Sequence, residues 1–151
     1  LAGLRAVFGR RVRLGVADLR TPEQVTDALA YAPDLLLSPF ASAELLAAAS
    51  GTPMVLGGLT PTEIDRALRL GPAAVQAIPC DALGSLYART LTALFEGEPL
   101  IAAGKLERFQ CEMWLESGAA AVAPSGIFST ADVEDPDLSD LRRRAQGYRF
   151  G

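Results

Sequence analysis

Short apolar runs alternate along the chain with segments of helical spacing. The apolar runs predict six β-strands, at residues 12–16, 34–39, 53–56, 73–78, 100–103 and 119–123. The intervening segments predict helices that begin near Thr21 and Thr60 or span 42–50, 85–95, 107–116 and 138–146. The strands are apolar throughout rather than alternating, which indicates burial on both faces and therefore a parallel sheet.

Local signals mark where the helices begin and end. The segments 21–24 (TPEQ) and 60–63 (TPTE) each place a threonine at the cap, a proline in the first turn and a glutamine or glutamate three residues after the cap. Gly51, Gly71 and the pair Ser117-Gly118 are typical helix ends. In the 85–95 helix the residues that recur at helical spacing are Leu86, Thr90, Leu91 and Leu94.

Each helix follows a strand after a short loop. This order predicts an α/β protein, either a doubly wound sheet or a (β/α)₈ TIM-type barrel. The barrel is favoured, because the loops are short and rich in Gly, Pro, Ser and Thr, and no GxGxxG sequence follows the first strand. With 151 residues, half of them hydrophobic, the chain has material for one core, so residues 1–151 are predicted to form a single domain.

Charge and composition narrow the range of partners. The net charge of −4 gives no indication of a nucleic-acid partner, which would need a basic face, and the arginines near 10–13 and 142–144 are interpreted as solvated surface. No apolar run approaches the ~20 residues of a membrane span, and there is no sign of a secretory leader. Two cysteines indicate a reducing compartment, so a cytoplasmic protein is expected. The chain has no histidine, and neither a metal nor a cofactor is expected.

Several short segments, in order and in register, resemble a family of aldolases. They are 14–17 (LGVA), 21–25 (TPEQV), 37–39 (LSP), 60–64 (TPTEI), 75–79 (VQAIP) and 82–84 (ALG). Together they are similar to the 2-keto-3-deoxy-6-phosphogluconate (KDPG) aldolases and the related 4-hydroxy-2-oxoglutarate (KHG) aldolases, from about residue 12 to residue 128. The resemblance implies a (β/α)₈ barrel, usually trimeric, that cleaves a 2-keto-4-hydroxy acid to pyruvate and an aldehyde.

The resemblance does not provide a counterpart for every catalytic residue of the family. Its Schiff-base lysine falls on Gln76, and an amide cannot condense with a ketone to form an iminium ion. Its general acid/base glutamate falls on a strand upstream of Leu1. Lys105, the only lysine of the chain, could be a relocated amine or an anion clamp, or simply a surface residue on a loop that has drifted.

The binding residues implied by the resemblance are also altered. Substrate contacts fall on Asp18, Ser38, Pro39 and Pro79. The phosphate cradle falls on Gly104, Lys105, Ser125 and Gly126, but its threonine is lost, one glycine has become lysine and the serine is displaced by one position. A weak small-anion site made by backbone N–H groups is therefore expected there.

For several of the candidate residues a purely structural role is the alternative to a functional one. Asp18 could cap a helix or be solvated, and Cys80 could be a small buried residue, because no histidine is present to form a Cys/His pair. Met113 and Trp114 fit the core face of a helix.

The resemblance places residues 1–9 in the second helix of the barrel, so six βα units are expected and the first two are absent. Either upstream residues exist beyond this sequence, or a six-unit fragment covers its open strand edges by oligomerising.

Two functional hypotheses follow. The first is a member of the KDPG/KHG aldolase family in which activity is lost or altered because Gln76 replaces the lysine. The second is a non-catalytic module that binds small anions or assembles on the same barrel. In either case the expected ligand is a small keto acid or a phosphate-bearing molecule, and the expected assembly is a homotrimer.

Overall fold

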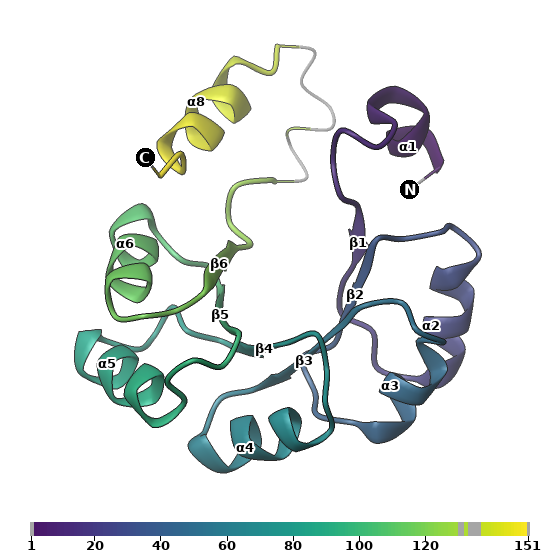
Figure 1. The fold of residues 1–151 in the computed structure, drawn as a ribbon. Helices are drawn as coiled ribbons and strands as arrows, with labels where there is room; N and C mark the ends of the chain where they lie inside the picture. The colour runs from purple at the N-terminus through teal and green to yellow at the C-terminus, as the bar shows by residue number, and fades with distance from the viewer. Residues whose placement is uncertain (1, 130–131, 133–136, 151) are drawn as a thin grey trace. The chain divides into compact units, whose positions relative to one another are not determined.

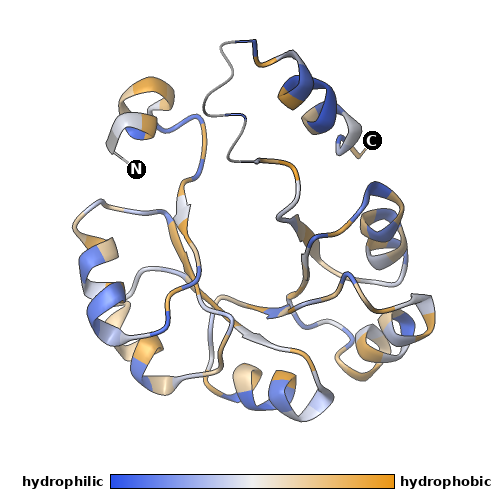
Figure 2. Cartoon of the chain, turned by 180° about the vertical axis from the view of Figure 1, so that it is seen from behind, coloured by the Kyte–Doolittle hydropathy of each residue, from blue (hydrophilic) through white to orange (hydrophobic). Residues whose placement is uncertain are grey.

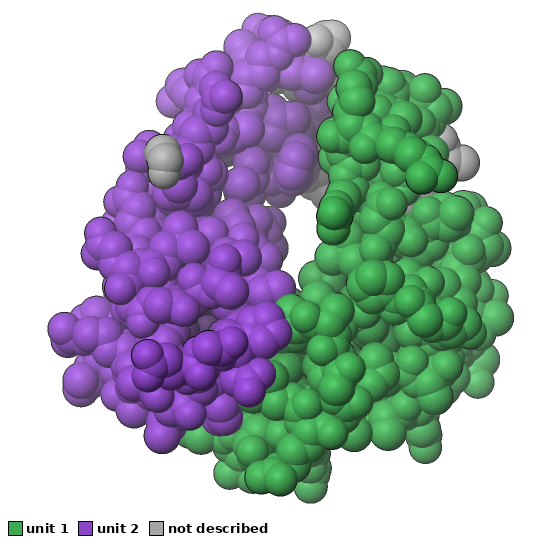
Figure 3. Space-filling view, in the orientation of Figure 1, with its two compact units in different colours: residues 1–77 green, residues 78–151 purple. Residues whose placement is uncertain are grey.

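The computed structural model describes residues 2–129, 132 and 137–150 (Figure 1). The chain divides into two compact units, Leu1–Ala77 and Ile78–Gly151, which Figure 3 colours green and purple. Each unit is built from strands followed by helices.

Unit 1 contains four parallel strands in the order in which they occur along the chain. The strands are β1 (Gly15–Val16), β2 (Leu35–Leu37), β3 (Met54–Gly58) and β4 (Ala74–Ala77). The helices are α1 (Ala2–Phe8), α2 (Pro22–Leu29), α3 (Ala43–Ala48) and α4 (Pro61–Arg69). The longest ladder joins β3 to β4, where Leu56 is the partner of Val75 and Gly57 the partner of Gln76.

Unit 2 contains two parallel strands, β5 (Leu100–Gly104) and β6 (Ala121–Pro124), with Ala102 paired to Val122. Its helices are α5 (Ser85–Leu94), α6 (Arg108–Glu116) and α8 (Ser139–Gly147). All six predicted strands are thus found in the predicted order, and each pairs in parallel within its unit. Most of the acidic segment 130–136, predicted to be a loop, lies outside the described residues.

The predicted capping signals form hydrogen bonds that fix how the strands lead into the helices. At α4, Thr60 Oγ1 accepts from Glu63 N, and Glu63 Oε2 accepts from Thr60 N at 2.8 Å. The backbone N–H groups of Thr60 and Leu59, which both donate to the Glu63 carboxylate, lower its pKa. At α2, Thr21 Oγ1 accepts from Gln24 N, but the Gln24 amide accepts from Arg20 N, one residue before the cap. Each loop is therefore bonded to the helix that follows it.

The core of unit 1 lies around β3, whose five residues are all buried. Leu36 on β2, Ile64 on α4 and Val75 on β4 are fully buried around it. Figure 2 shows the strands mainly in white and orange, whereas α4 carries blue residues on one side and orange on the other. Burial of these apolar side chains is the main stabilising contribution to the unit.

Of the four α5 residues that recur at helical spacing, only Leu91 is buried. Leu86 and Leu94 are 72% and 60% exposed. The buried residues are Ala88, Leu91 and Thr92. Thr92 tolerates burial because its hydroxyl donates to Ala88 O at 2.9 Å. The pattern of leucines was misleading because α5 carries apolar residues on two faces, and spacing alone does not show which one packs.

Trp114 is fully buried on α6, as predicted, whereas Met113 is only half-buried.

Polar bonds attach the N-terminal helix, α1, to unit 1. Arg5 on α1 is paired with Asp34 at 2.6 Å, and Asp34 also accepts from Leu14 N at 2.7 Å. These two donors lower the pKa of the Asp34 carboxyl, the backbone bond from Leu14 having the larger effect.

Candidate functional site

Parallel strands end at the same edge of a sheet, so the residues that follow them in unit 1 gather at that edge. Asp18 follows β1, Ser38 and Pro39 follow β2, and Gln76 lies near the end of β4. These are the residues of unit 1 to which the sequence assigned a role in the site. Contacts made by β3 determine how these residues lie within unit 1.

The loop after β2 lies against the end of β3. A Cβ at Gly57 would lie 2.6 Å from the carbonyl carbon and oxygen of Pro39 and 2.7 Å from its Cα. Real Cβ atoms do not approach a backbone this closely, so the contact requires glycine. Gly57 therefore determines where Ser38 and Pro39 lie.

Gln76 points to the sheet face opposite α4. Successive residues of a strand point to opposite faces, and a Cβ at Gly58 would lie 2.7 Å from the Cβ of Glu63 on α4. Gly57 accordingly faces away from α4, toward Pro39. Because Gln76 is the partner of Gly57 on the neighbouring strand, it shares that face.

The amide of Gln76 is tied to the loop after β2. The side chain is 5% exposed, and its Nε2 donates to Ser38 O at 2.8 Å. Ser38 is fully buried; its backbone N–H donates to Val55 O, and its Oγ accepts from Phe40 N at 3.1 Å. An uncharged amide in this place orders a neighbouring loop and supplies no nucleophile.

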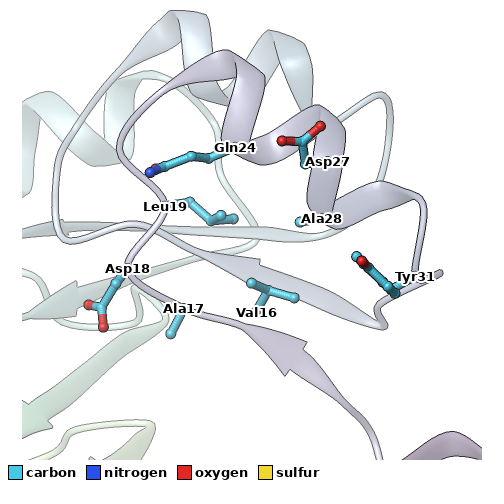
Figure 4. Close-up of a pocket in the computed structure, with 8 residues that line it drawn as sticks. All are labelled: Val16, Ala17, Asp18, Leu19, Gln24, Asp27, Ala28 and Tyr31. Carbon is cyan, nitrogen blue, oxygen red and sulfur yellow. The ribbon is translucent and has the colours of Figure 1, made fainter. Parts of the chain in front are cut away.

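Asp18 adopts a left-handed backbone conformation, with φ of 62°, at the end of the first strand segment. It lines a pocket of about 380 Å³ between the β1 segment and α2. The other lining residues are polar Gln24 and Asp27 and the mostly apolar Val16, Ala17, Leu19, Ala28 and Tyr31. Figure 4 shows the Asp18 carboxylate turned away from Asp27 and Tyr31. Of the expected site residues only Asp18 lines this pocket, which sequence reasoning did not find.

Pro79 and Cys80 lie in the loop after β4, at the start of unit 2. Pro79 is exposed and follows a cis peptide bond. Cys80 is fully buried, and its backbone N–H donates to Ala103 O at 2.8 Å. Burial raises the pKa of the Cys80 thiol to about 12, with a smaller contribution from the charge of Asp81. The interpretation of Cys80 as a small buried residue is confirmed.

We expect neither cysteine to react with iodoacetamide in the native protein at pH 8. At that pH a thiol with a pKa near 12 is ionised in about one molecule in ten thousand, and the thiolate is the reactive form. Burial also raises the pKa of Cys111. Intact mass should show no adduct on the folded protein and two after denaturation in urea. Rapid modification of the folded protein would contradict the buried position of both thiols.

The residues of the expected phosphate cradle lie after β5 and β6 in unit 2. Gly104 has φ of 143°, and a Cβ there would lie 2.5 Å from Asp81 Oδ1. Lys105, Ser125 and Gly126 are exposed. Ser125 N donates to Gly104 O at 2.8 Å, so that donor is already used between the two strand ends and is not available to an anion.

Among the described residues, no group of three or more His, Cys, Asp or Glu side chains is placed to hold a metal ion. None of the helices in the described part of the chain combines the length and apolar content of a membrane-spanning segment.

Comparison with solved structures shows which proteins share this fold. No protein-family profile and no curated protein sequence matches the chain. Among solved structures, the KDPG aldolase of Legionella pneumophila, with pyruvate captured as a covalent carbinolamine intermediate, is 20% identical. The match covers 99% of this chain and 74% of that one, with a TM-score of 0.85.

Two further structures are similar. A 4-hydroxy-2-oxoglutarate/KDPG aldolase is 26% identical over 96% of this chain and 72% of its own, with a TM-score of 0.79. A cube-shaped cage designed by fusing symmetric oligomeric domains is 22% identical over 97% of this chain and 54% of its own, with a TM-score of 0.83. The chain is thus a parallel α/β protein with the fold of these structures. Its resemblance to the KDPG and KHG aldolases, indicated by the sequence, is confirmed.

Proposed function

We propose that this chain is a KDPG/KHG-type aldolase relative in which Schiff-base chemistry is lost or altered. The observation that carries the proposal is Gln76: it stands where the resemblance puts the reactive lysine, and its amide nitrogen is bonded to Ser38 O at 2.8 Å. Lysine in such a position would be a desolvated amine able to attack a ketone. Glutamine instead holds the loop after β2.

The same resemblance supports the remaining features of the proposal. The whole chain is one barrel-type domain of the (β/α)₈ class, acting as a homotrimer on a small keto acid such as pyruvate or on a phosphate-bearing analogue. Asp18, Ser38, Pro39 and Pro79 are the proposed substrate contacts. The two cysteines are both free, and this supports the proposed reducing, cytoplasmic location.

A non-catalytic anion-binding module is less well supported. The glycines and serine after β5 and β6 are partly used in their own hydrogen bonds, as at Ser125. Lys105, Gly104 and Gly126 are left as the proposed rim of a weak site. The exposure of Lys105 and Gly126 argues against a cradle that excludes water.

The direct test is reductive trapping with pyruvate and borohydride, followed by intact mass. We expect no adduct on the unaltered protein, because Gln76 supplies no amine and Lys105, the only lysine side chain, is exposed rather than desolvated in a pocket. Trapping that disappears in Lys105→Arg would show instead that the amine has been relocated. Adduct formation by Gln76→Lys would show that the surrounding pocket still accepts pyruvate.

A further inference from the structure

The helix α8 is attached to unit 2 by side-chain hydrogen bonds rather than by a buried face. None of its residues, 139–147, is buried, whereas α5 buries three residues and α6 buries two. An isolated helix of this length is marginal in water, and a segment with few buried apolar contacts has a low local stability. We call residues 139–150, α8 with its short tail, the strap.

Arg144 attaches the strap to the loop after β6. Its Nε donates to Ile127 O at 3.0 Å, and its Nη2 is paired with the Asp132 carboxylate. Asp132 in turn accepts from Ser129 N at 2.6 Å. One guanidinium therefore holds both a backbone carbonyl and the carboxylate that organises this loop.

The end of the strap is attached to the loop after β5 and to α6. Tyr148 Oη donates to Leu106 O at 2.9 Å, and Leu106 itself is buried. Arg108, the first residue of α6, donates to Gly147 O at 2.9 Å. The strap thus joins the loops that follow the two strands of unit 2 and lies against the helix between them.

Cys111 lies on the part of α6 that meets the strap, and its side chain is fully buried. Its neighbours on the helix surface, three and four residues away, include Arg108 and Leu115. Arg108 bonds to the strap, and Leu115 lines a groove together with Phe150 of the tail. Burial raises the pKa of Tyr148, with smaller contributions from neighbouring charges, one of them that of Cys111.

We propose that the strap opens as a unit while the remainder of unit 2 stays folded, and that opening exposes the Cys111 thiol. The inference does not depend on the proposed function. The closed strap fixes the loops after β5 and β6, and the open strap frees both. Lys105 directly precedes Leu106 in the first of these loops, so the proposed rim of the weak anion site is released at the same time.

Alkylation of Cys111 by iodoacetamide at pH 8 measures the open fraction. Burial raises the pKa of this thiol in the closed state, and only a reachable thiolate reacts. Brief labelling leaves the native protein unmodified, whereas prolonged labelling collects the rare open molecules at a rate proportional to their population. Intact mass gives the number of adducts, and peptide mapping assigns each adduct to its cysteine.

Arg144→Met removes the attachment to the loop after β6 but keeps an unbranched side chain. We expect it to raise the alkylation rate of Cys111 at least about tenfold, the factor for a lost hydrogen bond from a charged donor. Arg143→Met is the matched control, with the same loss of charge one residue away. Arg143 is paired with Asp140 inside α8 and its side chain is 79% exposed, so the rate should not change.

Tyr148→Phe tests the second attachment independently, because it removes only the hydroxyl that bonds to Leu106 O. The expected increase in the rate is about fivefold, as for a neutral hydrogen bond. Since opening the strap exposes little surface, the rates should rise only slightly in low urea. Cys80, buried in the loop after β4, should stay unmodified throughout.

Three results would overturn the inference. The first is an equal rate for Arg144→Met and Arg143→Met, which would show that Arg144 does not hold the strap. The second is modification of Cys80 together with Cys111, because general unfolding exposes both thiols. The third is no adduct on Cys111 in either Arg144→Met or Tyr148→Phe, which would show that the strap does not cover this thiol.

Discussion

Gly57→Ala is expected to lower the free energy of unfolding by about 3 kcal/mol, among the largest effects of any single methyl group in unit 1. The added Cβ would lie 2.6 Å from the backbone of Pro39, which cannot rotate away as a flexible side chain would. Relief requires moving the loop after β2, and this breaks the bond between Gln76 and Ser38 O. Urea denaturation followed by circular dichroism measures the loss.

The matched control is Gly3→Ala, the same change in the same unit. No atom lies within 4 Å of a Cβ at Gly3, and the residue is in α1, where alanine is preferred. That variant should be as stable as the unaltered protein or more stable by up to about 1 kcal/mol. Equal stability of the two variants would show that the loop is not held against Gly57.

Gln76→Met is expected to lower the free energy of unfolding by about 1–3 kcal/mol at pH 7. Methionine fills a similar length of space, but it leaves the buried carbonyl oxygen of Ser38 without its donor. The cost is that of desolvating an acceptor that is no longer bonded. No loss of stability would show that water replaces the amide at Ser38 O.

Gln76→Glu separates the hydrogen bond from the shape of the side chain. A protonated carboxyl can donate to Ser38 O, whereas a carboxylate cannot, so burial and this bond should raise the folded-state pKa above the unfolded value of about 4.3. The contribution of this bond to stability is then fully present below pH ~4.3 and is lost as the pH rises through the folded pKa. Urea titrations of both variants from acid to neutral pH should show this fall for Gln76→Glu and its absence for Gln76→Met.

The positions of strands and helices were largely predictable, because they depend on local signals. Continuous apolar runs gave the strands, and the threonine caps at 21 and 60 made the expected bonds. β3 extends two residues beyond its predicted end, to Gly58. A Cβ on either of its two glycines would meet backbone or side-chain atoms at under 3 Å. The face of α5 was not predictable, because which of two apolar faces is buried depends on neighbouring elements that spacing does not encode.

The candidate site was predictable only as a set of positions. The sequence placed Asp18, Ser38, Pro39 and Gln76 at strand ends, where they are found. It could not show that Gln76 bonds to Ser38 O, 38 residues away, because a backbone carbonyl leaves no trace in the side-chain pattern. The adjacent glycines of β3 were the available signal, since glycine inside a strand often marks a close approach of backbone.

Trp114, the only tryptophan of the protein, belongs to unit 2 and is fully buried, and its indole nitrogen has no partner among the described residues. Its fluorescence is therefore an intrinsic reporter of unit 2 alone, with the short-wavelength emission of an apolar surrounding. Circular dichroism, by contrast, averages over the helices of both units. Coincidence of the two signals during denaturation means that the units unfold together, and separation of the signals means that one can open while the other stays folded.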